Sequence, residues 1–486
     1  MDINYFKAAL SHHSKGNWNK ALEIYQHILK EDPDNYAVLQ NYGPLLAQLR
    51  EYKLAKNIFE KCLKIKPNDS LLIYNYGKFF HDQKIYEKAI EYYNKSFEIN
   101  PKNAMSKYNI GNIYFIQKKF NTAIEYYKKA TEVDPSNFFA YNNIALSFKK
   151  LGKFDEALKF YKKAIDINKD FVDGHVNYGT LLLLTNKLEL GFKEYEWRKK
   201  SKIFSDYLDY SKLQIKTPIW TGQNLQKKTI LILSEQGIGD LIQFSRYLFY
   251  LANKYNCKVI LRLKQNLSHF FEDKDKRIKI ISENDKVPKH DYHNHLASLP
   301  GIFYKKNKNF PKTINFIKEK KEIIEKWKKI LSKYDGLKIG INSHSTATVG
   351  ERIIPIEYFS NLTKIKEINF FVIQKDFNKN NMKTINQNLN VNYYEELDKL
   401  GKPFEDTIGL VKNLDLIITA DTSLGHLSAT LGKPTWIVLP FVSDWRWFQD
   451  EKKSIWYETV KLFRQKKIGN WGQVFDLIYK DLEKKL

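Results

Sequence analysis

Cysteine is almost absent from this sequence, because its 486 residues include only Cys62 and Cys257. Two cysteines this far apart predict neither a disulfide framework nor a cysteine-based metal site. Long apolar runs are missing too, so no membrane-spanning helix is expected. Residues 1–10 also lack the basic-then-apolar order of a signal peptide. These absences predict a cytoplasmic protein, or one that lies peripherally at the inner face of the membrane.

Arginine is scarce although the chain is strongly basic. Only eight of the 80 Lys and Arg residues are arginines, and the formal net charge is +25. A specific nucleic-acid reader clusters its basic residues and uses arginine for base edges, whereas the lysines here are spread along the whole chain. We therefore expect solvated lysine faces and no specific nucleic-acid partner. An arginine kept in such a chain indicates a position that needs a planar fork of donors. Five lie in or beside segments with further signals: Arg198, Arg246, Arg352, Arg446 and Arg464.

The first part of the chain repeats itself every 34 residues. Prolines, alanines and glycines recur in phase: Pro33, Pro67, Pro101 and Pro135; Ala21, Ala55, Ala89, Ala123 and Ala157; Gly43, Gly77, Gly111 and Gly179, with Ala145 in the fourth place. This pattern resembles the tetratricopeptide repeat, in which each unit is a helix–turn–helix. The resemblance covers residues 2–205, about five and a half repeats, and implies an α-solenoid that binds a peptide or protein partner in its groove. Lys169 and Gly191 replace Pro and Ala near the end of the array, as expected of terminal repeats.

From about residue 228 the pattern changes to short apolar runs separated by helical stretches. The expected strands are 229–234, 258–263, 278–282, 338–342, 370–374, 414–419 and 435–439. Strands that alternate with helices predict parallel βαβ units. A lysine-rich helical stretch at 318–333 links two groups of strands. We therefore predict two Rossmann-like, doubly wound α/β domains, 206–334 and 335–486, that face each other across a cleft.

The first segment with chemical potential runs from 230 to 243. An apolar strand leads into Gly237 and Gly239 and then into a helix that begins near Asp240. Ligands of open α/β sheets bind at the carboxyl ends of strands, and glycines allow a ligand to approach the backbone. Asp240 is either a helix cap or a functional carboxylate. The turn is not a dinucleotide fingerprint, because Ile242 occupies the third glycine position.

The second segment runs from 414 to 434. Asp421, Thr422 and Ser423 follow an apolar strand and open a helix, and His426 lies one turn further on. These side chains and the free N–H groups of the helix start suit a sugar or a phosphate. The alternatives are a simple helix cap and a structural histidine.

These motifs resemble the bacterial heptosyltransferase-type glycosyltransferases (glycosyltransferase family 9-like). The resemblance spans about 228–470 and is carried by the Gly-x-Gly-Asp turn, the segment from Asp421 to Ala429, and Gly432-Lys433-Pro434. More closely, the chain resembles bacterial proteins that join tetratricopeptide repeats to such a domain. It shares with them the turn at 235–244, Ser298-Leu299-Pro300 and Asp444-Trp445-Arg446-Trp447. The resemblance implies a GT-B fold with an acceptor-side and a donor-side domain.

The resemblance also implies a role for particular residues. Asp240 matches the catalytic base, and Asp421 matches the carboxylate that holds the donor sugar. Arg352 stands where the family has a Lys that contacts the donor diphosphate. The remaining donor-binding positions are Thr422, Ser423 and His426; Gly237 and Gly239 form the phosphate-side turn. Further substrate contacts are expected from Gln243, Gln374, Trp445 and Arg446, although the aromatic segment around Trp445 has packing of its own loop as the alternative.

The expected activity is an inverting transfer of a hexosyl or heptosyl group from a nucleotide-diphosphate sugar. One base accepts the acceptor's proton, and a helix N-terminus with Arg352 stabilises the departing diphosphate. No cofactor or metal is expected, because no Asp-x-Asp motif follows a strand and the histidines lack ligand spacing. The acceptor is a protein, a polysaccharide or a lipopolysaccharide presented by the repeats. The alternative is a noncatalytic interaction scaffold with a relic or ligand-sensing GT-B domain.

Overall fold

The computed structural model describes residues 3–202, 204, 213, 215–264, 266–344, 352–374, 389–449 and 452–486. The chain forms two compact units, Met1–Gly174 and His175–Leu486, and each is described by itself. The predicted domain boundaries after residues 205 and 334 stay predictions. None of the helices in the described ranges is long and apolar enough to cross a membrane.

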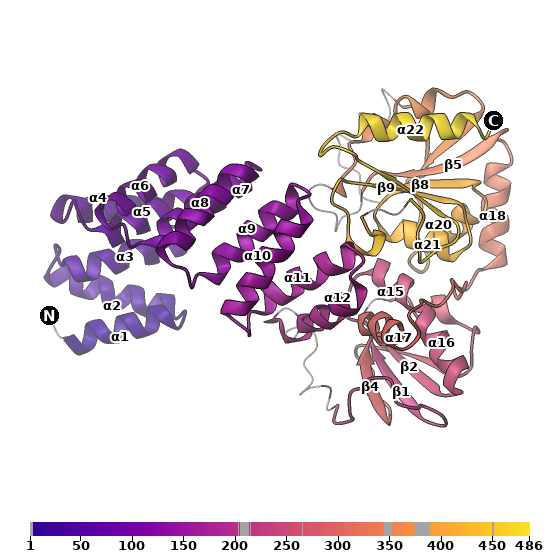
Figure 1. The fold of residues 1–486 in the computed structure, drawn as a ribbon, viewed down its shortest axis with the longest axis horizontal. Helices are drawn as coiled ribbons and strands as arrows, with labels where there is room; N and C mark the ends of the chain where they lie inside the picture. The colour runs from indigo at the N-terminus through magenta and orange to yellow at the C-terminus, as the bar shows by residue number, and fades with distance from the viewer. Residues whose placement is uncertain are drawn as a thin grey trace. The chain divides into compact units, whose positions relative to one another are not determined.

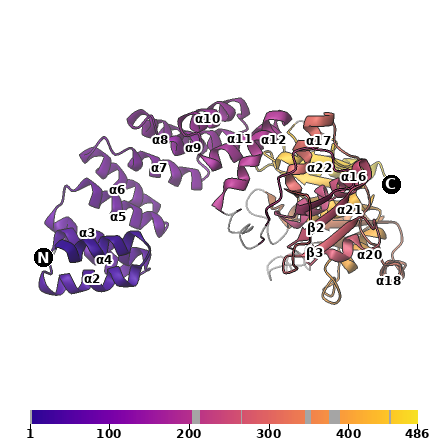
Figure 2. The same cartoon turned by 90° about the horizontal axis from the view of Figure 1, so that it is seen from below.

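The first unit is a stack of antiparallel helix pairs (Figures 1 and 2). The first helices of the pairs are α1 (Ile3–Ser14), α3 (Tyr36–Gln48), α5 (Ser70–Asp82), α7 (Ala104–Ile116) and α9 (Phe138–Lys150). The second helices are α2 (Trp18–Glu31), α4 (Tyr52–Ile65), α6 (Tyr86–Ile99), α8 (Phe120–Val133) and α10 (Phe154–Ile167). The predicted helical solenoid is confirmed.

The repeated small residues lie where two helices meet. A Cβ atom on Gly77 would stand 2.9 Å from the Tyr93 ring, and one on Gly111 would stand 2.6 Å from the Tyr127 ring. A larger side chain would force the paired helices apart. The repeated alanines are fully buried on the second helices: Ala21, Ala55, Ala89, Ala123 and Ala157.

Each repeated proline stands two residues beyond the end of a second helix. The residue before a proline is pushed away from the helical conformation, which ends the helix. Helix α10 ends in the same register before Lys169, and its C-cap Asn168 is extended with φ −125° and ψ 102°. The proline therefore reinforces a helix end that the packing of the repeat already sets.

The second unit opens with one further helix pair. Helix α11 (Val172–Leu184) straddles the boundary between the units, and α12 (Leu188–Tyr195) is followed directly by the 3-10 helix η1 (Glu196–Lys200). Gly191 lies in α12, where a Cβ atom would stand 2.8 Å from Leu183 of α11. This pair continues the pattern of close helix contacts in a shortened form.

A four-stranded parallel sheet follows, with the order β3-β2-β1-β4. Its strands are β1 (Thr229–Leu233), β2 (Lys258–Leu263), β3 (Ile278–Ser282) and β4 (Tyr292–His295). The helical elements around it are α15 (Ile238–Phe244), α16 (Arg246–Tyr255), η2 (Ser268–Phe271), η3 (Leu296–Ser298) and α17 (Leu299–Asn307).

A six-stranded parallel sheet with the order β10-β9-β8-β5-β6-β7 completes the unit. Its strands are β5 (Leu337–Asn342), β6 (Ile368–Val372), β7 (Asn392–Tyr393), β8 (Leu416–Ala420), β9 (Thr435–Leu439) and β10 (Val460–Arg464). Its helical elements are α18 (Lys321–Leu331), η5 (Ile356–Phe359), η6 (Leu362–Lys364), α20 (Glu405–Lys412), α21 (Ser423–Thr430), η7 (Trp445–Trp447) and α22 (Gly472–Glu483). The predicted α/β class is confirmed for this region.

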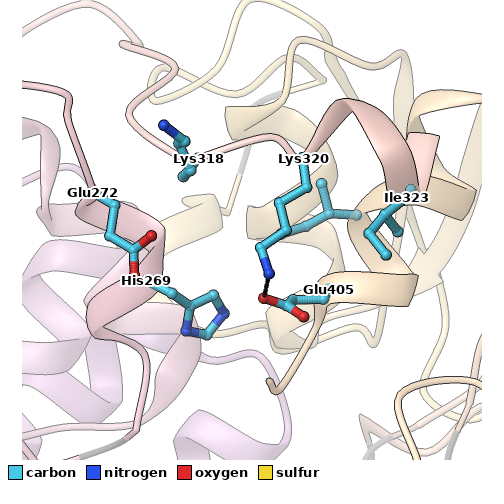
Figure 3. A pocket seen from close by; sticks show the side chains of 8 residues that line it. His269, Glu272, Lys318, Lys320, Ile323 and Glu405 are labelled. Carbon is cyan, nitrogen blue, oxygen red and sulfur yellow. Dashed lines mark ion pairs between the residues drawn. The ribbon is translucent and has the colours of Figure 1, made fainter. Parts of the chain in front are cut away.

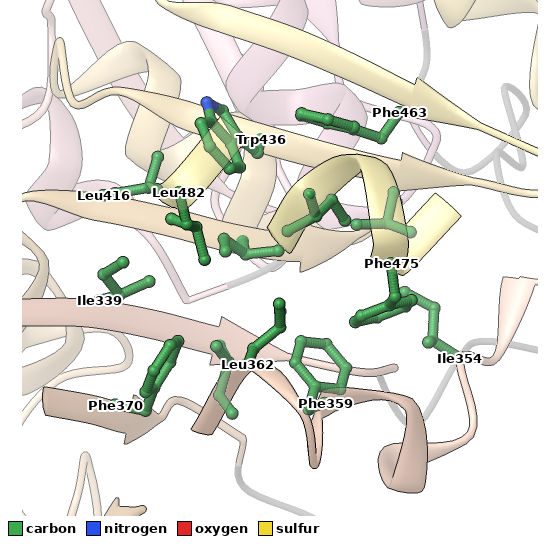
Figure 4. Packing of buried hydrophobic residues seen from close by; sticks show 14 of the residues in the cluster. Ile339, Ile354, Phe359, Leu362, Phe370, Leu416, Trp436, Phe463, Phe475 and Leu482 are labelled. Atoms are coloured by element: carbon green, nitrogen blue, oxygen red, sulfur yellow. The ribbon is translucent and has the colours of Figure 1, made fainter. Parts of the chain in front are cut away.

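One face of the second sheet is covered by α22 together with η5 and η6 (Figure 1). Phe475 and Leu482 of α22 pack with Phe359 and Leu362 onto the apolar side chains of the strands (Figure 4). Trp436 of β9 and the other core residues of this face are almost fully buried. This core holds the carboxyl ends of β5 and β8 in place.

All seven predicted strands are present, with ends that differ by at most two residues. Three strands were not predicted: β4, β7 and β10. Strand β4 has the polar sequence Tyr292-His293-Asn294-His295, yet His293, Asn294 and His295 are buried. Hydrophobic periodicity detects no such strand, because its polar side chains are satisfied by tertiary contacts.

Candidate functional site

Both sheets reverse their direction of winding beside a strand that leads into a predicted motif. In the first sheet, β1 lies between β2 and β4. In the second, β5 lies between β6 and β8. Open α/β sheets bind ligands at the carboxyl ends of strands beside such a switch point. The Gly-x-Gly turn follows β1 and the Asp421 segment follows β8, so both motifs lie at these positions.

The turn after β1 gives Asp240 two contacts. Gly237 is the N-cap of α15, and Asp240 is the third residue of that helix. The carboxylate accepts a hydrogen bond from the Gly237 N–H, as the third helical residue does in a capping box. It also forms an ion pair with Arg446. The capping interpretation therefore describes part of the geometry but leaves the ion pair unexplained.

Close packing explains why a glycine stands at position 239. A Cβ atom there would stand 3.0 Å from Cδ2 of His426 and 3.7 Å from Cα of Ser423. The glycine thus lets α15 approach the first turn of α21. Gly237 has an ordinary extended conformation, with φ −71° and ψ 173°, and is exposed. The predicted approach of a phosphate to these glycines stays a prediction.

A chain of alternating charges links the turn to the second motif. Arg446, paired with Asp240, donates from Nη1 to Oδ1 of Asp444 at 2.7 Å. Arg352 donates from Nη2 to Oδ2 of Asp444 at 2.9 Å, and its Nη1 lies 3.8 Å from Oδ2 of Asp421. The order is Asp240, Arg446, Asp444, Arg352, Asp421. The structure therefore brings together one predicted residue of the first sheet and three of the second.

Burial and charge set the protonation of these carboxylates. Burial raises the pKa of Asp240, and Asp444 adds to the rise, against the opposing effect of Arg446. Burial and the nearby Asp444 likewise raise the pKa of Asp421, against Arg352. Burial also acts to raise the pKa of Asp444, but Arg446 and Arg352 outweigh it and lower that pKa to about 2. Asp444 is thus the permanent anion of the network, and Asp240 and Asp421 are more basic than Asp444.

The N-cap residue of α21 does not cap the helix with its side chain. Thr422 is this N-cap, and its side chain forms no capping hydrogen bond. Its Oγ1 lies instead 3.4 Å from Oδ1 of Asn342 and 3.2 Å from Oγ1 of Thr419. Ser423 is the first helical residue. The first N–H groups of a helix attract anions, and the Thr422 side chain does not compete for them.

His426 is a buried histidine with contacts of its own. It is 4% exposed, its ring stacks on Trp447 with centroids 5.1 Å apart, and its Nδ1 lies 3.0 Å from the Tyr457 hydroxyl. Burial, and then the cations Arg446 and Arg246, lower the pKa of His426 to about 3. The ring is neutral at pH 7. Contact between His426 and a diphosphate stays a prediction, and the geometry adds a structural role.

We expect His426 to make folding depend on pH. The unfolded chain protonates this residue near pH 6.5, whereas the folded protein does so only near pH 3. Because the unfolded state binds more protons in this window, the stabilisation is complete above pH 6.5 and is lost as the pH falls. His426→Gln should remove about 1.4 kcal/mol per pH unit from the slope, as measured by urea unfolding at pH 7, 6 and 5. His27→Gln, on a side chain that is 60% exposed, is the control, and equal slopes in both variants would refute the assignment.

The two glutamines occupy different surroundings. Gln374 follows β6 and accepts hydrogen bonds from the Ser343 N–H and hydroxyl at 3.2 and 3.1 Å, and its amide contacts His344. It lines a cavity of about 210 Å³ together with Tyr393 and Tyr394. Gln243 is fully buried, and its amide has no hydrogen-bond partner among the described residues. A substrate contact stays a prediction for both.

The aromatic segment after β9 is a packed cluster. Trp445 is 4% exposed, and its ring lies 5.6 Å from that of Tyr195 and 6.3 Å from that of Phe244. Arg446 is 9% exposed. Trp445 therefore packs on α12 and α15 and not only on its own loop, and its contact with a substrate stays a prediction, as does that of Arg446.

Sequence reasoning missed several residues of this arrangement. Asp444 was quoted only as part of a motif, and Gln236, Tyr195 and Trp447 received no role. Gln236 accepts a hydrogen bond from Nη2 of Arg446 at 2.9 Å. A usable signal was the scarcity of arginine, because an arginine retained in this chain marks a buried network. No group of three His, Cys, Asp or Glu side chains suited to a metal was found in the parts of the chain that the structure describes.

A second, smaller hollow lies away from this site (Figure 3). His269 donates a hydrogen bond from Nε2 to the Pro403 carbonyl oxygen at 3.0 Å. Lys320 and Glu405 form an ion pair of 2.7 Å across it. The pair joins the segment before α18 to the first residue of α20. No predicted site residue lines this hollow.

We expect this ion pair to contribute little. Lys320 is 35% exposed and Glu405 is 12% exposed, and a pair that faces solvent is worth about 0.2–1 kcal/mol. Glu405→Gln should lower the free energy of unfolding by that amount, and the loss should shrink in 1 M salt. Glu325→Gln, on a side chain that is 68% exposed, is the control. A loss above about 2 kcal/mol would mean that the carboxylate has a larger structural role than an exposed pair provides.

Comparison with known families identifies the first unit. A TPR repeat family matches residues 111–152, and tetratricopeptide repeat families match residues 12–74, 72–103 and 138–171. The N-terminal region therefore carries tetratricopeptide repeats, which are protein-interaction modules.

The proteins to which the chain is similar are distant from it in sequence. The protein FlbA of Caulobacter vibrioides is 23% identical over 315 residues, which are 60% of this chain and 52% of FlbA, so the chain spans about half the length of that relative. Among solved structures, MamA is 24% identical with a TM-score of 0.30 and covers 35% of this chain and 92% of its own. PilF of Pseudomonas aeruginosa is 19% identical with a TM-score of 0.37 and covers 43% of this chain and 95% of its own.

Proposed function

We propose that the region from 206 to 486 is an inverting, metal-independent glycosyltransferase with the GT-B arrangement of heptosyltransferase-type enzymes. It would move a hexosyl or heptosyl group from a nucleotide-diphosphate sugar to a protein or glycan acceptor. The observation that supports this best is the ion pair between Asp240, after β1, and Arg446, after β9. It joins the carboxyl ends of the two parallel sheets, where a donor and an acceptor would meet.

Each part of the site has a role in this reaction. Asp240, whose pKa is raised by burial, accepts the proton of the acceptor hydroxyl. Arg352 is 45% exposed and lies beside the start of α21. Together with the N–H groups there it would receive the diphosphate and stabilise it as it departs. Asp421 would accept a hydrogen bond from a hydroxyl of the donor sugar. The repeats would bind the acceptor or a protein that presents it.

The second candidate is a noncatalytic interaction scaffold whose α/β region senses a nucleotide ligand. One observation favours it: Arg446 already occupies the proposed base in an ion pair. A carboxylate that stays paired with a guanidinium is a weaker base than a free one. The two candidates share the diphosphate site and differ only in turnover.

Binding and turnover of nucleotides test the proposal. We expect calorimetry of the full chain with UDP, GDP, ADP and CDP to find one that binds, and Arg352→Ala to weaken its binding about 10-fold or more, because a charge-assisted hydrogen bond is worth about 1.5–3 kcal/mol. Arg277→Ala is the control, since that arginine pairs with Asp275 at the far side of the first sheet. Hydrolysis of the matching nucleotide sugar then separates the enzyme from the sensor. Absence of binding by every nucleotide would refute both.

A further inference from the structure

The segment that ends the repeat array in the sequence lies against the turn that carries Asp240. Arg198 of η1 is 6% exposed. Its Nη2 donates to Oε1 of Glu235 at 3.0 Å and to the Ser298 hydroxyl at 2.8 Å, and its Nη1 donates to Oε1 of Glu196 at 2.7 Å. The Glu235 side chain is 1% exposed. The planar guanidinium of Arg198 therefore holds the side chain of Glu235, which is the first residue of the turn after Ser234.

Tyr195, the last residue of α12, fixes the next residue of the same turn. Its hydroxyl accepts a hydrogen bond from Nε2 of Gln236 at 2.6 Å. The guanidinium of Arg198 lies over the Tyr195 ring, 4.5 Å from its centroid. Gln236 in turn accepts from Arg446 at 2.9 Å, and Arg446 pairs with Asp240. One hydrogen-bonded route thus runs from Tyr195 through Gln236 and Arg446 to the proposed base.

We propose that Tyr195 and Arg198 are positioning residues of the candidate site. They hold Gln236 and Glu235, and thereby set where Arg446 and Asp240 lie. The inference rests on the proposed function for its kinetic consequence, but the positioning itself is a property of the fold. The turn needs such support, because α15 is seven residues long and its N-cap, Gly237, has no side chain to cap the helix. A catalytic group that is displaced by about 1 Å loses about 100-fold in rate.

The arrangement has a consequence for the organisation of the chain. Tyr195 and Arg198 lie before residue 206, in the segment that the repeat pattern assigns to the solenoid. The structure places both in the compact unit His175–Leu486. The end of the array is therefore part of the site, and an α/β region taken from residue 206 onward lacks two of its supports.

Tyr195→Phe in the full chain tests the positioning, because it removes only the hydroxyl. Tyr247→Phe is a matched control, since the Tyr247 hydroxyl is buried and has no hydrogen-bond partner among the described residues.

For hydrolysis of the nucleotide sugar that the wild type turns over, Tyr195→Phe should lower kcat about 10-fold, the worth of one hydrogen bond, and leave KM unchanged. The pH at which the rate falls on the acidic side of the pH–rate profile should also differ from that of the wild type. Arg198→Lys, which keeps the charge but loses the fork, should lower kcat as well.

The inference is overturned if Tyr195→Phe and Tyr247→Phe have equal kcat values and equal pH–rate profiles. If the wild type hydrolyses no nucleotide sugar, that result refutes the proposed enzymatic function but not the positioning role. Hydrogen exchange then tests the positioning role, because Tyr195→Phe should speed amide exchange in residues 236–241 relative to Tyr247→Phe while β1 stays protected. Equal exchange in the two variants would refute the positioning role.

Discussion

Replacement of Asp240 by Asn should reduce glycosyl transfer by about 10²–10⁴-fold, the usual share of general base catalysis. Donor affinity should stay nearly constant, because the base acts in the transition state. Asn has the size of Asp and retains an oxygen that can accept the Gly237 N–H, so the start of α15 should persist. The ion pair with Arg446 is lost, but Arg446 keeps Asp444 and Gln236 as partners.

The measurement is turnover and nucleotide-sugar affinity for the wild type and Asp240→Asn, with hydrolysis of the donor as the reaction until the acceptor is identified. Asp275→Asn is the control, because that carboxylate pairs with Arg277 away from the site. A wild-type rate in Asp240→Asn would show that the carboxylate is a helix cap and an ion-pair partner, and that the base lies elsewhere.

The repeats were predictable because each unit carries the same local information. Small residues recur where paired helices touch, as at Gly77 and Gly111, and prolines recur where second helices end. Each repeat contacts its neighbours in the same way, so a period in the sequence is a period in the packing. Only the final pair departs from it, because α12 is eight residues long where α10 is fourteen.

The sheets were predictable only where their strands are continuously apolar. Strands β1, β8 and β9 are buried on both faces and read as apolar runs. Strand β10 alternates, since Lys461 is exposed between buried neighbours, and β4 is polar but buried. The strand order also depends on contacts that are distant in sequence, so the switch points could not be derived from local pattern.

The site was predictable in its motifs but not in its network. Asp240 and Asp421 follow strands whose ends could be located, so their neighbourhood could be expected. Gly239 was expected to admit a ligand, and its nearest neighbour proves to be His426. The links through Asp444, Gln236 and Tyr195 depend on tertiary contacts, for example between Arg446 and Gln236, which are 210 positions apart, and no single sequence reveals such a pairing.

Removal of Arg446 should have the largest effect on stability. Its side chain is 10% exposed and lies between the carboxylates of Asp240 and Asp444, which are 19% and 15% exposed. Arg446→Met keeps an unbranched apolar side chain but leaves Asp240 without its cation, while Asp444 keeps only Arg352 as a partner. The loss of one partner from a buried ion pair costs about 3–5 kcal/mol. We expect a decrease of that size in the free energy of unfolding at pH 7, as measured by urea unfolding of the full chain.

The cause of this loss can be separated from simple loss of packing. If unpaired charge is responsible, Asp240→Asn in the Arg446→Met background should recover part of the stability, because it removes the carboxylate that has lost its cation. Lowering the pH should also narrow the gap in the free energy of unfolding between Arg446→Met and the wild type, since burial raises the pKa of Asp240 and favours its neutral form once Arg446 is gone. Arg277→Met, at a half-buried pair away from the site, should cost less, about 1 kcal/mol. If neither the second substitution nor the lower pH narrows the gap, Arg446 stabilises the fold through its contacts with Trp445 and Phe244, and the chain of alternating charges is not what holds the two sheets' carboxyl ends together.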